Sequence, residues 1–85
     1  MSKLEKLILK LLSATSDKNF KFSDLLLLLK TFDFEERNTG GSHKVFYREG
    51  IEEIINIQPD GNKAKPYQVK QVRNIFIKYK LLSNE

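Results

Sequence analysis

The sequence predicts a single α+β domain in which a three-stranded antiparallel sheet carries helices on one face. Apolar residues recur at helical spacing near both ends of the chain, and three β-rich segments with short connections lie between them. A chain of 85 residues forms one domain at most. It is too short to enclose a large cavity, so any substrate is expected to lie across its surface.

The first helix is predicted over residue 2 to about residue 14. Its apolar residues follow the i, i+3, i+4, i+7, i+8 pattern of an amphipathic helix: Leu4, Leu7, Ile8, Leu11 and Leu12. Ser2 and Glu5, three residues apart, fit a capping box at its start. A polar break at residues 15–19 then ends the helix.

A second helix is expected to begin at Ser23, whose hydroxyl can cap free backbone N–H groups. Phe22 and Leu27 are placed for a hydrophobic staple around that cap. The unbroken leucine run at residues 25–29 indicates a helix covered on more than one side. The first helix is the expected cover.

Three strands are predicted next. Residues 32–35 alternate phenylalanine with an acidic residue, as in a half-buried strand, and residues 44–48 and 51–57 are rich in β-formers. The glycines at 40–41 and the Glu49-Gly50 pair mark the turns between them. Connections this short make the three strands an antiparallel meander.

A closing helix is predicted after a polar loop at residues 58–65. Pro66 suits its first position. On a helical wheel one face is apolar: Val69, Val72, Ile75, Phe76 and Tyr79. Lys70, Arg73 and Lys80 share a different face. From the second helix onward the order is α-β-β-β-α, the order of double-stranded-RNA-binding domains.

The charge distribution favours a polyanionic partner. The net charge is +4, and residues 61–83 contain cations but no acid: Lys63, Lys65, Lys70, Arg73, Lys78 and Lys80. A basic end on a small domain is typical of nucleic-acid binding, although a lysine-rich helix is often only solvated.

The composition argues against several other classes of protein. The chain has no cysteine and a single histidine, so neither a thiolate zinc site nor another protein-only transition-metal site is expected, and we expect no cofactor. Lys6 and Lys10 interrupt the N-terminal apolar run, which does not resemble a signal peptide. No apolar stretch is long enough to span a bilayer, so we expect a cytoplasmic protein with no membrane partner. The oligomeric state is left open.

The segment Gly41-Ser42-His43-Lys44-Val45-Phe46, between two predicted strands, resembles the Gly-Ser-His signature of the HicA toxins. These are small RNA-cleaving toxins of bacterial and archaeal toxin–antitoxin systems with a double-stranded-RNA-binding-like fold. The run from Gly61 to Pro66 is similar to the lysine-plus-proline segment that precedes the last helix of that family.

The resemblance extends from Ser23 to about Leu81. It implies a HicA-like core at residues 22–82, with residues 1–18 as an additional N-terminal helix and connection that the shortest members lack. The family often has a basic residue immediately before the signature, where this chain has Gly40.

The resemblance implies a metal-independent endoribonuclease that binds and cleaves mRNA, with His43 as its catalytic residue and a HicB antitoxin as its inhibitor. The basic loop and last helix extend the expected RNA contacts to these residues: Gly41, Ser42, Lys44, Lys63, Lys65, Lys70 and Arg73.

A single histidine can carry out one of the two proton transfers that RNA cleavage requires. RNA carries its own nucleophile, the 2′-OH, and an imidazole can act as the general base or the general acid near neutral pH. One histidine cannot make both proton transfers in one step, so Lys44, Tyr47, Lys63 or water is needed as well. Two alternatives stay open: a non-catalytic RNA-binding module, and a protein-interaction domain with an acidic partner.

Overall fold

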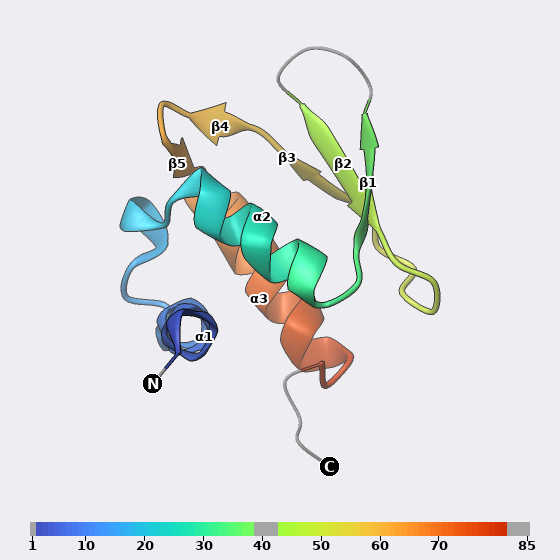
Figure 1. Cartoon of the computed structure of the whole chain (residues 1–85), viewed down its shortest axis with the longest axis horizontal. Helices are drawn as coiled ribbons and strands as arrows, with labels where there is room; N and C mark the ends of the chain where they lie inside the picture. The colour runs from blue at the N-terminus through green and yellow to red at the C-terminus, as the bar shows by residue number, and fades with distance from the viewer. Residues whose placement is uncertain (1, 39–42, 82–85) are drawn as a thin grey trace.

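The computed structural model describes residues 2–38 and 43–81. Its elements are listed here in chain order: α1 (Lys3–Ser13), the short 3-10 helix η1 (Asp17–Asn19), α2 (Phe22–Thr31), β1 (Glu35–Asn38), β2 (Lys44–Tyr47), β3 (Ile55–Ile57), β4 (Pro59–Asp60), β5 (Lys63–Ala64) and α3 (Pro66–Lys78). Helices α2 and α3 lie on the same side of the sheet, and α1 contacts both of them on the side away from the sheet (Figure 1). The predicted α+β architecture is confirmed.

The main sheet is an antiparallel meander in the order β1-β2-β3, as predicted. Lys44 pairs with Asn38 of β1 and with Ile57 of β3, and Phe46 pairs with Ile55. The side chains of Phe46, Ile55 and Ile57 are fully buried toward the helices. Because side chains alternate along a strand, the residues between them face the open side of the sheet.

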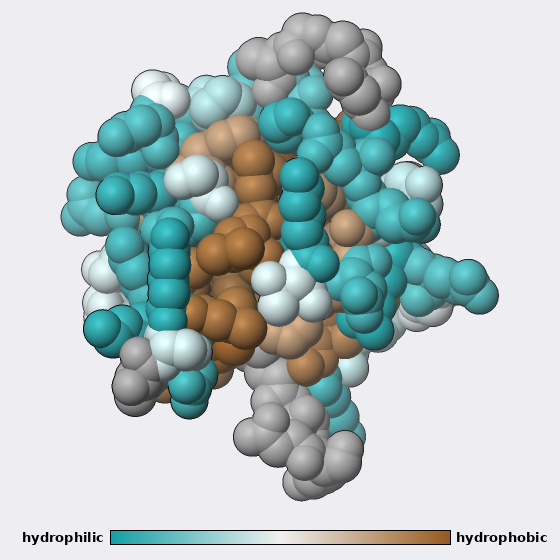
Figure 2. Space-filling model, viewed as in Figure 1, coloured by the Kyte–Doolittle hydropathy of each residue, from teal (hydrophilic) through white to brown (hydrophobic). Residues whose placement is uncertain are grey.

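A single hydrophobic core joins the sheet to all three helices. It includes Leu7 and Leu11 of α1, so the prediction that α1 packs against α2 is confirmed. Helix α1 does not cover α2 completely, because the side chain of Leu27 remains 39% exposed. Figure 2, viewed as in Figure 1, shows a hydrophobic area in the middle of the molecular surface, surrounded by hydrophilic side chains.

Two of the predicted helix starts are confirmed. Ser2 accepts from the backbone N–H of Glu5 while the Glu5 carboxylate accepts from Ser2, which completes the capping box of α1. Pro66 is the first residue of α3. The predicted apolar face of α3 is buried at Val69, Val72, Ile75 and Phe76, while Tyr79 is half-buried.

The predicted start of α2 is wrong by one residue. The helix begins at Phe22 with Lys21 as its N-cap, and Ser23 lies in the first turn, so neither the Ser23 cap nor the Phe22–Leu27 staple forms as expected. The cause is a tertiary contact: the backbone N–H of Phe22 donates to the carbonyl of Asn62 at 3.0 Å. A partner 40 positions away therefore replaces the local cap.

The predicted first strand is also displaced, because residues 32–34 end α2 instead. Asp33 adopts a left-handed conformation with φ of 68°. Its N–H donates to the carbonyl of Lys30, and that of Phe34 donates to Leu29, which is the bonding pattern of a Schellman motif. Phe32 and Phe34 pack on Phe76, with ring centroids 4.9 and 6.1 Å away. The alternation at 32–35 is therefore a helix end anchored in the core.

The remaining differences lie between β2 and α3. The third strand is shorter than predicted, since residues 51–54 are not in a strand, and the second ends at Tyr47. The predicted loop at 58–65 contains a small hairpin, β4–β5, in which Asp60 pairs with Lys63. None of the helices in the described ranges is long and apolar enough to cross a membrane.

Candidate functional site

His43 is an exposed residue immediately before β2, at one end of the sheet. The next residue, Lys44, pairs with Ile57 at the end of β3. Continuing this antiparallel register by one residue sets the backbone of His43 opposite that of Gln58. The predicted RNA contacts Gly41 and Ser42 lie outside the described residues. The placement of His43 therefore follows from the strand that comes directly after it, β2.

Gln58 links this end of the sheet to the start of α3. Its backbone N–H donates to Oε1 of Gln68 at 3.2 Å, and its own Oε1 accepts from Nζ of Lys65 at 3.3 Å. Gln68 is only 3% exposed. The link therefore brings Lys65, the N-cap of α3, to the same end of the molecule as His43.

Sequence reasoning did not identify this pair of glutamines. One signal was available: Gln68 lies four residues before Val72, on the apolar face of α3, where a buried polar side chain needs a hydrogen-bond partner. The identity of that partner depends on how β3 meets α3, and the sequence contains no local sign of it.

The basic loop, residues 61–65, is fixed by backbone hydrogen bonds to the segment before α2. The N–H of Ala64 donates to the carbonyl of Phe20 at 2.8 Å, which ties β5 to the segment before α2. Nζ of Lys63 donates to Oδ1 of Asn19 at 3.1 Å. Lys63 and Lys65, which were both predicted to contact RNA, therefore start from a fixed backbone but reach toward different partners.

Lys44 has a carboxylate partner. Its Nζ lies 3.0 Å from Oε2 of Glu36, and Lys30 approaches the other carboxylate oxygen at 3.5 Å. The hydrogen bond from Lys44, followed by the charges of Lys44 and Lys30, lowers the pKa of Glu36. The ammonium of Lys44, expected to face RNA, is thus engaged by a carboxylate that it shares with Lys30.

Arg73 differs most from its prediction. We expected it on an exposed basic face with Lys70, but Arg73 is only 9% exposed. Its Nη1 donates to the carbonyl of Leu11 at 3.2 Å and to Oδ1 of Asp17 at 2.9 Å, while Nη2 donates to Oδ2 of Asp17 at 3.1 Å. The expectation of an exposed Arg73 is wrong because α1 and η1 cover that side of α3. Lys70 remains exposed.

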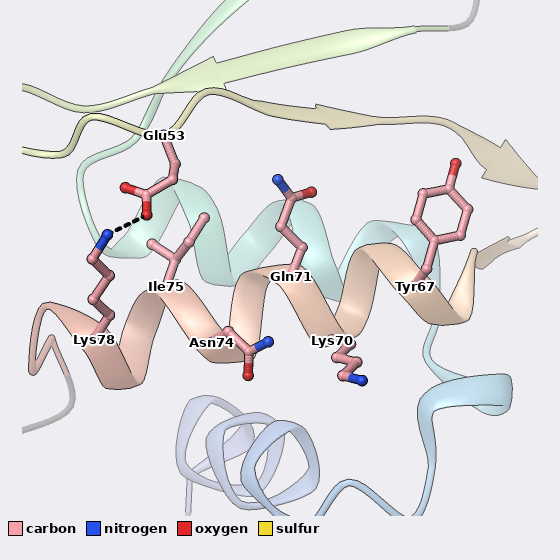
Figure 3. Close-up of a pocket in the computed structure, with 7 residues that line it drawn as sticks. All are labelled: Glu53, Tyr67, Lys70, Gln71, Asn74, Ile75 and Lys78. Carbon is pink, nitrogen blue, oxygen red and sulfur yellow. Dashed lines mark hydrogen bonds and ion pairs between the residues drawn. The ribbon is translucent and has the colours of Figure 1, made fainter.

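A groove of about 340 Å³ runs along α3. Figure 3 shows Tyr67 at one end, Gln71 in the middle, and the ion pair of Glu53 with Lys78 at the other end. Lys70 and Asn74 line its outer side, and Ile75 lies in the groove wall. The groove starts at the end of α3 that is tied to Gln58.

The ion pair at the far end of this groove was not predicted from the sequence. Nζ of Lys78 lies 2.8 Å from Oε2 of Glu53, and the Tyr79 hydroxyl donates to Oε1 at 2.6 Å. The hydrogen bond from Lys78, followed by that from Tyr79, lowers the pKa of Glu53 to about 2. The same contact raises the pKa of Lys78.

A second groove, of about 360 Å³, lies on the open face of the sheet. The guanidinium of Arg37 lies 5.3 Å from the ring centroid of Tyr47. Two arginines and three glutamates line this groove: Arg37, Arg48, Glu35, Glu49 and Glu52. Tyr47 is four residues along the chain from His43, roughly 13 Å at the rise of a strand. The Tyr47 ring is engaged instead by the Arg37 guanidinium in this groove.

The described residues contain no group of three His, Asp or Glu side chains placed to hold a metal ion. Comparisons with known proteins identify no relative of this chain: no family model matches it, and neither the curated proteins nor the solved structures contain a significant match.

Proposed function

We propose that this chain is a HicA-type ribonuclease that binds mRNA through Lys65 and α3 and cleaves it with His43. The observation that carries the proposal is the pair of hydrogen bonds that join Gln58 to Gln68 and Lys65 at the start of α3. The register of β2 and β3, continued by one residue, sets Gln58 opposite the exposed His43. The Gly-Ser-His segment before β2 and the Lys-Pro start of α3 support it. So does the succession of α2, the three-stranded sheet and α3, which resembles the order of double-stranded-RNA-binding domains apart from the short hairpin β4–β5 before α3.

The proposed reaction is an internal transesterification. The 2′-oxygen attacks the adjacent phosphorus, the bond from phosphorus to the 5′-oxygen breaks, and a 2′,3′-cyclic phosphate and a 5′-hydroxyl result. A base accepts the 2′ proton and an acid supplies a proton to the departing 5′-oxygen. His43 is exposed and can take either role, which contributes roughly 10²–10⁴-fold.

Lys65 is the cation that best fits this site. Its ammonium is held at Gln58, the residue that the continued register sets opposite His43, where it can stabilise negative charge on a phosphate. Lys44 is paired with Glu36, and Lys63 is held by Asn19. Tyr47 lies four residues further along the chain, and its ring is engaged by the Arg37 guanidinium. Water therefore remains the simplest partner for His43.

The test compares His43→Ala with the wild type on labelled single-stranded RNA. We expect His43→Ala to lower the cleavage rate by at least about 10²-fold, with RNA affinity and melting temperature nearly unchanged, because an exposed residue contributes little to packing. Asn56→Ala, an exposed substitution on β3, is the matched control and should cleave normally. Cleavage by His43→Ala at the wild-type rate would remove His43 from the mechanism.

The same assay separates the two alternatives. RNA binding without cleavage by the wild type would identify a non-catalytic RNA-binding module. Neither binding nor cleavage would favour a protein-interaction domain with an acidic partner. We further propose a HicB-like antitoxin as the inhibitor. It would be a small acidic protein encoded next to this chain, and its co-expression should relieve growth arrest that depends on His43.

A further inference from the structure

We propose that the groove along α3 binds an unpaired base of the RNA, with the base stacked on Tyr67. This inference rests on the proposed function and makes single-stranded RNA its substrate class. It follows from the position of Tyr67, the chemistry of the groove and the charge around it.

Tyr67 is an aromatic side chain held in solvent at the start of α3. It is 63% exposed, and its hydroxyl lies 3.5 Å from Nε2 of the buried Gln68. Figure 3 shows the ring extending from the first turn of α3 at one end of the groove. An exposed ring is not unusual by itself, but this one borders a hollow surface and leaves room for a planar ligand.

The groove beyond the ring can recognise the edge of a base. Gln71 and Asn74 each carry an amide that can donate and accept hydrogen bonds. Neither amide has a side-chain hydrogen-bond partner among residues 2–38 and 43–81. Ile75 lines the groove but is only 3% exposed, so the two amides dominate its surface there. A volume of about 340 Å³ lies within the range of roughly 300–1,000 Å³ typical of small-ligand sites.

The charge around the groove suits a polyanion. Lys70 is exposed on its outer side, and no acidic residue occurs between Gly61 and Leu81. The one carboxylate in the groove, that of Glu53, is bonded to Lys78 and Tyr79. A phosphate that enters from the Lys65 end therefore meets no free negative charge there.

The groove is adjacent to the proposed cleavage site. Gln68 follows Tyr67 in α3 and holds the backbone of Gln58, which lies opposite His43 in the continued register. A base on Tyr67 therefore belongs to a nucleotide close to the phosphate at His43. Bases in a duplex are already stacked on each other, so only an unpaired base can present a face to this ring.

The open face of the sheet is less suitable. The ring of Tyr47 already has the Arg37 guanidinium at 5.3 Å, and Glu35, Glu49 and Glu52 line the same groove. A base approaching Tyr47 would displace the cation and bring its phosphate close to carboxylates. Tyr47 thus provides a matched control for Tyr67.

The test uses fluorescence anisotropy with a short single-stranded RNA in the His43→Ala background, so that cleavage does not interfere. Tyr67→Ala should weaken binding roughly 5- to 150-fold, the range found when an aromatic stacking partner of one base is truncated. Tyr67→Phe, which keeps the ring, should bind like the parent, and so should Tyr47→Ala. The same RNA in a duplex should bind more weakly and be insensitive to Tyr67→Ala.

A series of RNAs, each lacking one base, identifies the stacked nucleotide. Removal of that base should weaken binding by the parent protein and cause no further loss in Tyr67→Ala. Equal affinities of the parent and Tyr67→Ala, with matching melting temperatures, would overturn the inference while leaving RNA cleavage by the wild type intact. A loss in Tyr47→Ala instead would move the base to the sheet. Absence of RNA binding by the parent would overturn both proposals.

Discussion

The guanidinium of Arg73 donates to both carboxylate oxygens of Asp17, at 2.9 and 3.1 Å, across 56 residues of sequence. This paired contact joins the middle of α3 to the segment that follows α1. A third hydrogen bond, to the carbonyl of Leu11, ties the same guanidinium to the last turns of α1 itself. The N-terminal helix is therefore fixed to the body of the domain by directed polar bonds as well as by apolar packing.

Replacing Arg73 by alanine should destabilise the protein. The change leaves the mostly buried carboxylate of Asp17 and the carbonyl of Leu11 without their partner, which costs about 3 kcal/mol. The melting temperature should fall by more than about 10 °C. Lys70→Ala, exposed on the same helix, is the control and should change stability by less than about 0.5 kcal/mol. A similar melting temperature for both variants would show that the pair contributes little.

Two adjacent leucines test the packing of α1. Leu11 is fully buried, whereas Leu12 is 41% exposed. Leu11→Ala should lower the free energy of unfolding by about 2–5 kcal/mol, because it removes apolar contacts and leaves a cavity. Leu12→Ala should lower it by much less, because part of this side chain is already in solvent. Denaturant unfolding of both variants measures the difference. Equal losses would mean that α1 does not pack in solution as it does in this structure.

RNA binding should depend steeply on salt, with Lys65 and Lys70 among the residues that neutralise phosphates. For single-stranded RNA each neutralised phosphate contributes about −0.7 to the slope of log affinity against log salt. Lys65→Ala with Lys70→Ala should therefore flatten the slope by about 1.4 and weaken all RNA sequences similarly. Anisotropy over a salt series in the His43→Ala background measures this slope.

The control for that experiment is Lys18→Ala, an exposed lysine in η1. It should leave the slope unchanged. If the double variant also leaves the slope unchanged, the RNA lies on another surface, and Arg37 and Arg48 on the open face of the sheet become the next residues to substitute.

Acid should weaken the contact between Glu53 and the end of α3. The hydrogen bonds from Lys78 and Tyr79 lower the pKa of Glu53 from 4.5 to about 2. A carboxylate with a lowered pKa stabilises the fold above its unfolded pKa, and that contribution is lost as the pH falls from about 4.5 toward 2. Wild-type stability should therefore fall over this range more steeply than that of Glu53→Gln.

Thermal unfolding of Glu53→Gln and wild type between pH 7 and pH 2 checks this prediction. The two curves should differ at pH 7 and converge at low pH. Glu52→Gln is the control, because the exposed Glu52 makes no ion pair within residues 2–38 and 43–81. Parallel curves for Glu53→Gln and wild type would contradict the predicted role of the carboxylate.

Features encoded by neighbouring residues could be predicted from the sequence. The capping box of Ser2 and Glu5, the start of α3 at Pro66 and the β-formers around Phe46 each depend on residues a few positions apart. Short connections then limited the three strands to a meander. In these cases local preference and tertiary structure agree, so a one-dimensional pattern was sufficient.

Features that depend on contacts between distant residues could not be predicted from the sequence. The alternation at Phe32 and Phe34 was compatible with a strand, and only the position of Phe76 shows that both rings anchor a helix end. Arg73 was assigned to a solvent-facing side because a helical wheel does not include a second helix packed on it. The candidate site was predicted at His43, but the connection through Gln58 and Gln68 depends on the junction of a strand with a helix.

The bracing of the basic loop has a consequence for the order in which the molecule forms. Lys63 meets Asn19 across 44 residues, and the loop backbone bonds to Phe20 and Phe22 only when both segments are present. Such distant contacts form after a long loop has been closed, which is slow compared with helix formation. The two segments, residues 19–22 and 62–64, must therefore both be present before these contacts can form, and a nascent chain that ends before residue 62 cannot make them.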